Sequence, residues 1–296
     1  MTHQQPNWTK KAASKIVGIQ FSVLSPEEIR KCSVAEITSR DTYSNNIPVI
    51  GGMFDPRLGV LEPGLKCPTD GLDYIKTPGY FGHIELAKPV FYYQYLPSIM
   101  KILKCVCIKC SKLLISKEAN KECVDMKPDE RWSHVHHLAT KVKRCGDDTQ
   151  DGCGCLVPKK IKKENLATLY AEWDGEADEG TTGESGSKEK LNMKMTPEVV
   201  LKIFKRISDE DVAFMGFSPK FSRPDWFICQ VLAIPPPAVR PSIKMDGNQR
   251  SEDDISHTIV NIIKANKTLL EKMNEPSVNS TIIDDWQSLL QYFIAT

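Results

Sequence analysis

The sequence predicts an α+β fold: short strands and several helices around an irregular core, together with a ribbon that binds zinc. Alternating β-branched residues at 16–23 are typical of a strand. Ser25 and Thr196 each precede a proline and a glutamate, which are signals of a helix start. Cys107 and Cys110 form the close cysteine pair of a structural zinc site. Strand, helix and metal-ribbon signals in one chain favour the α+β class.

Composition indicates a folded protein. Its 296 residues, of which 41% are hydrophobic, are enough for one large domain or two ordinary ones. The net charge of +1 gives no overall indication of nucleic-acid binding. The apolar runs are far shorter than the roughly 20 residues of a membrane helix, and the N-terminus lacks a secretory signal. We therefore expect an intracellular protein without a membrane partner, whose 10 cysteines are metal ligands or buried thiols rather than disulfides.

Further elements follow from local patterns along the chain. Between 47 and 82, glycine and proline are frequent, which predicts loops with short strands at best. Three more helices are expected where apolar residues recur at helical spacing, at 97–103, 256–273 and 287–294. Residues 173–194 are acidic and almost without apolar side chains, so we expect a flexible, solvated insertion without a function of its own.

The cysteines of the middle region predict one closed metal site. Cys107 and Cys110 supply one pair, and Cys145 and Cys153 are expected to supply the other. Four thiolates leave no position for a catalytic water, so the zinc is expected to be structural. The second pair is loosely spaced, and Cys155 remains an alternative to Cys153. The alternative to zinc is a set of plain buried thiols.

Other potential ligands near this site are expected to be structural. Cys105 is interpreted as a packed neighbour of the cluster. His134 and His137 would share one face of a helix, with His136 between them, but no acidic residue lies at metal-ligand spacing nearby. A packed or solvated helix face is therefore the preferred interpretation of these histidines.

Five longer stretches identify a family. They are GGMFDPRLGV at 51–60, YFGHIELAKPVF at 80–91, FSRPDW at 221–226, PPPAVRPSI at 235–243 and NQRSEDD at 248–254. Together they resemble the N-terminal clamp region of the largest subunit of a eukaryotic-type, RNA polymerase II-like DNA-directed RNA polymerase, in a divergent form. The match covers nearly the whole chain outside the acidic insertion, and it implies an irregular clamp core with a zinc-bound ribbon.

The resemblance implies that a first zinc site has degenerated. In the family, the segment from Cys67 to Tyr80 supplies a C-x2-C pair, a third cysteine and a histidine. This chain keeps Cys67 and has Asp70, Thr77 and Tyr80 at the other three ligand positions. Zinc is therefore expected to be absent here, and His83 is expected to be structural. The aromatic residues expected to hold the loop by packing are Tyr74, Tyr80 and Phe81.

The proline-rich segment is implied to be the lid of the polymerase, at 235–254, where RNA separates from the template. Prolines stiffen the backbone, and Arg240, Lys244 and Arg250 are expected to bind nucleic-acid phosphates without reading sequence. A proline-rich linker is the alternative that an isolated PPP motif would favour. The flanking matches support the lid.

The family also implies a domain organisation. We expect an N-terminal clamp core with the degenerate first zinc loop at 1–104, and a zinc-binding clamp head at 105–172. The acidic insertion at 173–194 follows, and then clamp-core helices with the lid at 195–296. The second zinc site is implied to be intact, so one structural zinc is expected, bound by Cys107, Cys110, Cys145 and Cys153.

No catalytic residue is expected in this chain. The family's motif Asn-Ala-Asp-Phe-Asp-Gly-Asp, which binds magnesium, does not occur in it, so magnesium is expected only in the complete enzyme. We therefore expect a truncated piece of the largest subunit, without polymerase activity alone. Its expected partners are the rest of that subunit, the second-largest subunit, the DNA template and the RNA–DNA hybrid. The expected location is the nucleus, or host cytoplasm or virion for a viral gene. An autonomous zinc-ribbon adaptor that binds protein partners is the alternative from another class.

Overall fold

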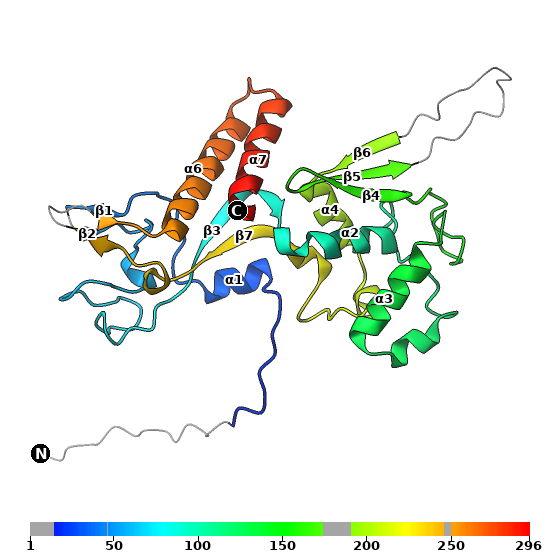
Figure 1. Ribbon diagram of the computed structural model, residues 1–296, viewed down its shortest axis with the longest axis horizontal. Helices are drawn as coiled ribbons and strands as arrows, with labels where there is room; N and C mark the ends of the chain where they lie inside the picture. The colour runs from blue at the N-terminus through cyan, green and yellow to red at the C-terminus, as the bar shows by residue number, and fades with distance from the viewer. Residues whose placement is uncertain (1–14, 46, 174–190, 246–249) are drawn as a thin grey trace, which may run out of the picture.

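The computed structural model describes residues 15–45, 47–173, 191–245 and 250–296 (Figure 1). Its helices are α1 (Pro26–Cys32), α2 (Leu96–Cys105), α3 (Pro128–Ala139), α4 (Pro197–Lys205), α5 (Asp209–Phe214), α6 (Asp254–Asn274) and α7 (Ser280–Ala295). Its strands are β1 (Tyr43–Ser44), β2 (Ile47–Pro48), β3 (Gly82–Phe91), β4 (Lys160–Glu164), β5 (Thr168–Trp173), β6 (Leu191–Met195), β7 (Ile228–Ile234), β8 (Ile243–Lys244) and β9 (Arg250–Ser251). The α+β class expected from the sequence is confirmed.

A two-stranded antiparallel ribbon of β3 and β7 crosses the middle of the molecule (Figure 1). Its register runs from Gly82 opposite Ile234 to Phe91 opposite Ile228, with a shift between Glu85 and Val90. Proline has no N–H to donate to a ladder, and Pro89 lies within this shifted part. The helices α6 and α7 pack against β3, and α1 packs against β7.

Side-chain amides from α6 and α7 bind the backbone of β3 at the shift in register and at the end of the strand. Asn266 accepts a hydrogen bond from the N–H of Ala87 at 2.8 Å and donates one to the carbonyl of Glu85 at 2.8 Å. Gln291 bonds Phe91 in the same reciprocal way, at 2.7 and 2.9 Å. Buried backbone groups left without a partner are costly, so these amides stabilise the irregular strand and fix both helices on it.

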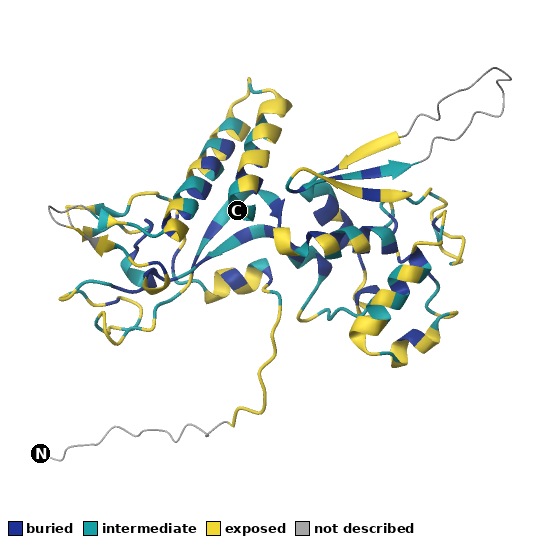
Figure 2. Ribbon diagram, viewed as in Figure 1, coloured by how far each residue is buried: buried dark blue, intermediate teal, exposed yellow. Residues whose placement is uncertain are grey.

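Two hydrophobic cores meet along the ribbon, and both appear as dark segments in Figure 2. One surrounds α2, α4 and the sheet β4–β5–β6, and includes Phe91 and Ile228. The other packs the 53–58 loop and the ribbon against α6, and includes Ile84 and Ile234. Each fully buried large apolar side chain contributes about 1.5–3 kcal/mol. Because β3 and β7 supply residues to both cores, the ribbon holds the two halves together.

Most helix predictions are confirmed. Helices begin after Ser25 and Thr196 as expected: Ser25 and Glu28 form a capping box at the start of α1, and Thr196 caps α4. The helices α2 and α6 cover the segments in which they were expected, whereas α7 begins at Ser280 rather than at Gln287. None of the described helices combines the length and the apolar content needed to cross a bilayer.

The predicted strand at 16–23 is wrong. Residues 15–25 have no regular structure, and the side chains of Ile16, Val17, Ile19 and Phe21 are exposed. Residue preferences for strands depend on a partner strand and a surface to pack on; the described residues provide no partner strand for this segment, and Val23 is its only apolar side chain that packs against a core. The N–H of Val23 donates a 2.9 Å hydrogen bond to the carbonyl of Phe221 near the end of the segment.

Paired strands occupy both ends of the segment in which an acidic insertion is expected. Trp173 and residues 191–194 belong to paired strands, with Trp173 opposite Leu191. Residues 174–190, which carry most of the prediction, lie outside the described part of the chain. The sheet β4–β5–β6 also crosses the expected boundaries at 172 and 194, and its core is shared with α2 and α4.

Candidate metal centre and cationic hairpin

Four cysteine thiols converge as the sequence predicted. The Sγ atoms of Cys107, Cys110, Cys145 and Cys153, here called the four-cysteine site, all lie within 4.8 Å of one another. The Sγ of Cys107 lies 3.5 Å from that of Cys153, and the Sγ of Cys110 lies 3.6 Å from that of Cys145. A tetrahedral ion with metal–sulfur bonds of about 2.3 Å would space its sulfurs by about 3.8 Å. The donors therefore fit a closed four-coordinate metal ion.

Two turns, a short one at 107–112 and a longer one at 145–155, build the four-cysteine site, and the same pair of backbone hydrogen bonds closes each of them. In the first, Cys107 donates its N–H to Lys112 O at 2.9 Å, and Ser111 donates to Cys107 O at 2.8 Å. In the second, Cys145 donates to Cys155 O at 2.9 Å, and Gly154 donates to Cys145 O at 2.8 Å. Ser111 and Gly154 both adopt left-handed backbone, with φ of 63° and 72°. Each turn thereby aims two cysteines at one point.

This geometry selects Cys153 rather than Cys155 as the fourth member. Cys155 takes part through its carbonyl, which accepts the bond from Cys145. Cys105 is fully buried in the core beside the site, as expected. Among the described residues, the group able to hold a metal contains no histidine. His136 lies beside the ring of Trp132 at 6.2 Å.

The pKa values in the four-cysteine site differ between the exposed Cys153 and the buried Cys107 and Cys145. The backbone N–H of Cys155 lowers the pKa of Cys153 to about 6, so this thiol ionises at neutral pH. Burial raises the pKa of Cys145 to about 11 and raises that of Cys107 further. The buried thiols therefore keep their protons at neutral pH unless a bound metal ion displaces them, because a thiol that coordinates a metal is deprotonated. An ion pair at 2.6 Å between Lys112 Nζ in the first turn and Asp151 Oδ2 in the second turn links the two turns.

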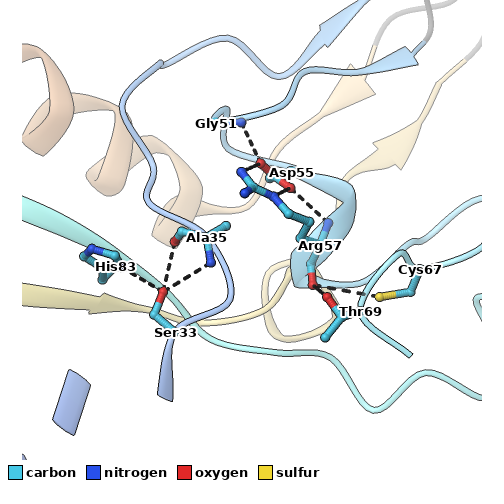
Figure 3. A network of polar contacts seen from close by, with 8 residues as sticks. All are labelled: Ser33, Ala35, Gly51, Asp55, Arg57, Cys67, Thr69 and His83. Carbon is cyan, nitrogen blue, oxygen red and sulfur yellow. Dashed lines mark hydrogen bonds and ion pairs between the residues drawn. The ribbon is translucent and has the colours of Figure 1, made fainter. Parts of the chain in front are cut away.

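The loop that begins at Cys67 is held by polar contacts. Cys67 is buried, with its Sγ 3.8 Å from the carbonyl of Arg57, which also accepts a 2.6 Å bond from Thr69 (Figure 3). The predicted aromatic packing is wrong for Tyr74 and Phe81, which are 41% and 54% exposed.

His83 is structural, as expected. Its Nδ1 lies 2.7 Å from Ser33 Oγ, and Ser33 also bonds the backbone of Ala35 (Figure 3). The Nε2 atom of His83 lies 3.6 Å from a carboxylate oxygen of Glu85. These contacts fix the start of β3 against the segment that follows α1.

The structure corrects the role expected for Arg240. This side chain is fully buried and cannot reach a phosphate from this position. Its guanidinium donates to Pro235 O at 3.1 Å, to Ser256 Oγ at 3.3 Å and to Met53 O at 2.6 Å. Burial lowers the pKa of Arg240 to about 10, so it keeps its charge at neutral pH. Arg240 thus joins the proline segment, the start of α6 and the 53–58 loop.

Strands β8 and β9 pair in antiparallel fashion after that anchored segment, and these two paired strands are here called the 243–251 hairpin. Lys244 lies opposite Arg250 in the register. Arg250 forms an ion pair with Glu62, and its guanidinium lies 3.8 Å from the ring centroid of Tyr43. Arg250 therefore fastens β9 to β1 and to the loop that contains Glu62, whereas Ile243 and Met245 on the first strand and just after it are exposed.

Two residues that the sequence analysis did not identify, Asp55 and Gly79, support the segment from which the 243–251 hairpin starts. Asp55 is fully buried; it caps a short 3-10 helix, Pro56–Leu58, and accepts bonds from Gly51 N and from Arg57 (Figure 3). An Asp-Pro step is a helix-start signal that could have indicated this role. Gly79 has φ of +83°, and a Cβ there would lie 2.7 Å from Pro236 Cβ. No local pattern predicts that contact.

Comparisons with known proteins agree with this architecture. The family model described as RNA polymerase Rpb1, domain 1, matches residues 13–296. The chain is 40% identical over 288 residues to DNA-directed RNA polymerase subunit Rpo1N of Methanocaldococcus jannaschii, a match that covers 94% of this chain and 20% of the relative. It is 35% identical over 291 residues to DNA-directed RNA polymerase II subunit RPB1 of Euplotoides octocarinatus, covering 95% of this chain and 59% of the relative.

The chain thus spans a fifth of one relative's length and 59% of the other's. The matched region contains the four-cysteine site, the β3–β7 ribbon and the 243–251 hairpin. Since the family model covers nearly all of the sequence, the chain belongs to the family of RNA polymerase Rpb1, domain 1.

Proposed function

We propose that this chain forms the clamp and lid portion of the largest subunit of a DNA-directed RNA polymerase. The observation that carries the proposal is the family match over residues 13–296. In this role the chain holds DNA and the RNA–DNA hybrid within the assembled enzyme. The family match does not favour the adaptor alternative.

The metal of the four-cysteine site is proposed to be a structural zinc ion. Four thiolates in a closed tetrahedral set suit zinc, and they leave no open position for a substrate or a catalytic water. When bound, the ion would link the two turns, so that the free energy of metal binding stabilises the fold. Cys107 and Cys110 fix one side, and Cys145 and Cys153 fix the other.

The 243–251 hairpin is proposed to act as the lid at the upstream edge of the hybrid. Lys244 is the proposed phosphate contact, because backbone-directed cations position nucleic acids without reading bases. Arg240 and Arg250 serve as positioning residues, since each is committed to contacts within the chain. A hairpin fastened at its base and along its second strand is a suitable wedge between two nucleic-acid strands.

The proposed partners are the rest of the largest subunit, the second-largest subunit, the DNA template and the hybrid. Magnesium and the catalytic aspartates belong to the complete enzyme in this proposal. The proposed location is the cell interior, in the nucleus or, for a viral gene, in host cytoplasm or the virion.

Reconstitution tests the proposal. The chain is co-expressed with the remaining polymerase subunits from the same genome, and the purified assembly is assayed for template-dependent RNA synthesis. Co-purification in an active enzyme supports the proposal. An active polymerase that assembles equally well without this chain would exclude it.

A further inference from the structure

The turn at Cys67 repeats the pair of backbone hydrogen bonds that closes each turn of the four-cysteine site, and it has the same length as the turn at 107–112. Cys67 donates its N–H to Leu72 O at 2.9 Å, and Gly71 donates to Cys67 O at 2.8 Å. Gly71 has a left-handed φ of +73°, which is similar to the φ values of Ser111 and Gly154 in the other two turns. An antiparallel backbone β-bridge joins the two residues that flank each turn: Lys66 with Asp73, Val106 with Leu113, and Arg144 with Leu156.

Asp70 stands in this third turn where the other two have their second cysteine. Cys110 and Cys153 immediately precede the left-handed residue of their turns, and Asp70 immediately precedes Gly71. The position that would aim a thiolate at a metal therefore aims a carboxylate instead.

The Asp70 carboxylate is the centre of a small network. It accepts hydrogen bonds from Leu72 N at 2.8 Å, from Thr77 Oγ1 at 2.8 Å and from Tyr80 OH at 3.1 Å. Burial alone would raise the pKa of Asp70, but these donors outweigh it and hold the pKa below the ordinary value. Hydrogen bonds to a charged acceptor are stronger than hydrogen bonds between neutral groups.

The residues at this place do not fit a zinc ion. Zinc requires thiolate, imidazole or carboxylate ligands, and this site offers one thiol and one carboxylate. The Thr77 and Tyr80 hydroxyls are neutral donors whose hydrogens point to Asp70, and burial together with Asp70 raises the pKa of Tyr80. A metal ion would have to displace these hydrogen bonds, and only Cys67 and Asp70 could coordinate it, whereas structural zinc takes four ligands.

The network lies next to the base of the 243–251 hairpin. Thr77 and Tyr80 flank Pro78 and Gly79, and Gly79 is in such close contact with Pro236 that a Cβ would not fit. The N–H of Tyr80 also bonds Leu58 O at 2.8 Å. Fixing both hydroxyls on Asp70 thus fixes the surface against which Pro236 packs.

We propose that the Asp70 carboxylate replaces a metal ion as the cross-link of the 67–80 loop, so that a turn with metal-site backbone supports the proline segment without metal. The inference concerns the isolated chain and does not depend on the polymerase proposal. It assigns Asp70, Thr77 and Tyr80 as one structural unit. Leu72 contributes through its backbone.

Metal analysis and hydrogen–deuterium exchange of the full chain test this inference. We expect one metal ion per chain in the wild type and in Asp70→Ala. Asp70→Ala should speed amide exchange at least about fivefold across 67–80, because several bonds to one charged acceptor are lost. Exchange at Val239 and Arg240 should also rise. Tyr80→Phe, which removes one donor and little volume, should give a smaller change of the same kind.

Asp73→Asn is the matched control, because Asp73 bonds the backbone N–H groups of Ile75 and Lys76 through an oxygen that asparagine retains. We expect wild-type exchange in this variant. A triple variant, Asp70→Cys with Thr77→Cys and Tyr80→His, provides a three-cysteine, one-histidine set with Cys67 and should bind a second metal ion.

Three results would overturn the inference. One is two metal ions per chain in the wild type. Another is unchanged exchange across 67–80 in both Asp70→Ala and Tyr80→Phe. The third is a triple variant that still binds one metal ion, since that would mean the four positions do not converge.

Discussion

The guanidinium of Arg240 donates a 2.6 Å hydrogen bond to the carbonyl of Met53, a residue 187 positions away in the sequence. The same side chain lies over the ring of Phe54, 5.2 Å from its centroid. A buried cation with three oxygen acceptors joins segments that share no secondary structure. The anchoring of the 243–251 hairpin thus depends on a core arginine.

Replacing Arg240 should therefore destabilise the fold. Arg240→Ala leaves buried carbonyl groups at Met53 and Pro235 without donors, and we expect a loss of about 2–4 kcal/mol in the free energy of unfolding. Urea denaturation measures the change. Arg40→Ala, at an exposed position, is the control and should stay within about 0.5 kcal/mol of wild type. Equal stability of the two variants would contradict the anchoring role.

Loss of one cysteine should empty the four-cysteine site. Cys110→Ala leaves three thiols, and since metal-binding energy is folding energy in such sites, we expect loss of bound zinc and faster amide exchange at 105–115 and 143–157. Metal analysis and exchange mass spectrometry provide the readouts. Cys32→Ala removes an exposed thiol and should change neither. Retention of stoichiometric zinc by Cys110→Ala would show that these four thiols are not the ligands.

Asp55 should make stability depend on pH. Burial opposes ionisation, but bonds from Arg57 and from Gly51 N outweigh it and lower the pKa of Asp55. A lowered folded-state pKa means that the carboxylate stabilises the fold fully above the unfolded value of about 3.9 and that this stability is lost as pH falls through the folded value.

The comparison of wild type with Asp55→Asn isolates this effect. At neutral pH we expect the variant to be less stable by about 1–3 kcal/mol. The difference in unfolding free energy should shrink as pH is lowered below about 4. Denaturation at a series of pH values measures it, and a difference that stays constant down to about pH 3 would contradict the charged role of Asp55.

The chain alone should not synthesise RNA. The aspartate motif that binds catalytic magnesium in the family is absent from the sequence, and nucleotide addition requires carboxylates that converge on metal ions. We expect no template-dependent incorporation of nucleotides by the purified chain with magnesium. Metal-dependent synthesis that co-elutes with the chain alone would refute this.

The features that the sequence predicted correctly are local. The helix caps, the amphipathic helix α6 and the cysteine pair Cys107/Cys110 each depend on residues within a few positions of one another. Cys145 and Cys153 could be added because metal chemistry requires four ligands. The resemblance supplied the family, which the comparisons confirm.

The features that could not be predicted depend on long-range contacts. From the sequence, Arg240 is expected to be a surface cation in a proline-rich segment. Its burial and its hydrogen bond to Met53 are evident only in the folded structure. The sequence shows a single cysteine at 67–80, but the hydrogen bonds from Thr77 and Tyr80 to Asp70 could be seen only in the folded loop. The alternating pattern at 16–23 predicted a strand because sequence does not state whether a partner strand is present.

The position of the 243–251 hairpin in the enzyme is the central claim, and site-specific photo-crosslinking tests it most directly. A photoreactive residue replaces Lys244 in the assembled polymerase, with Lys220, an exposed lysine outside the hairpin, as the control position. On stalled elongation complexes, we predict that position 244 crosslinks to nucleic acid at the upstream edge of the RNA–DNA hybrid and that position 220 does not. An active enzyme in which position 244 crosslinks no more than position 220 would contradict the account.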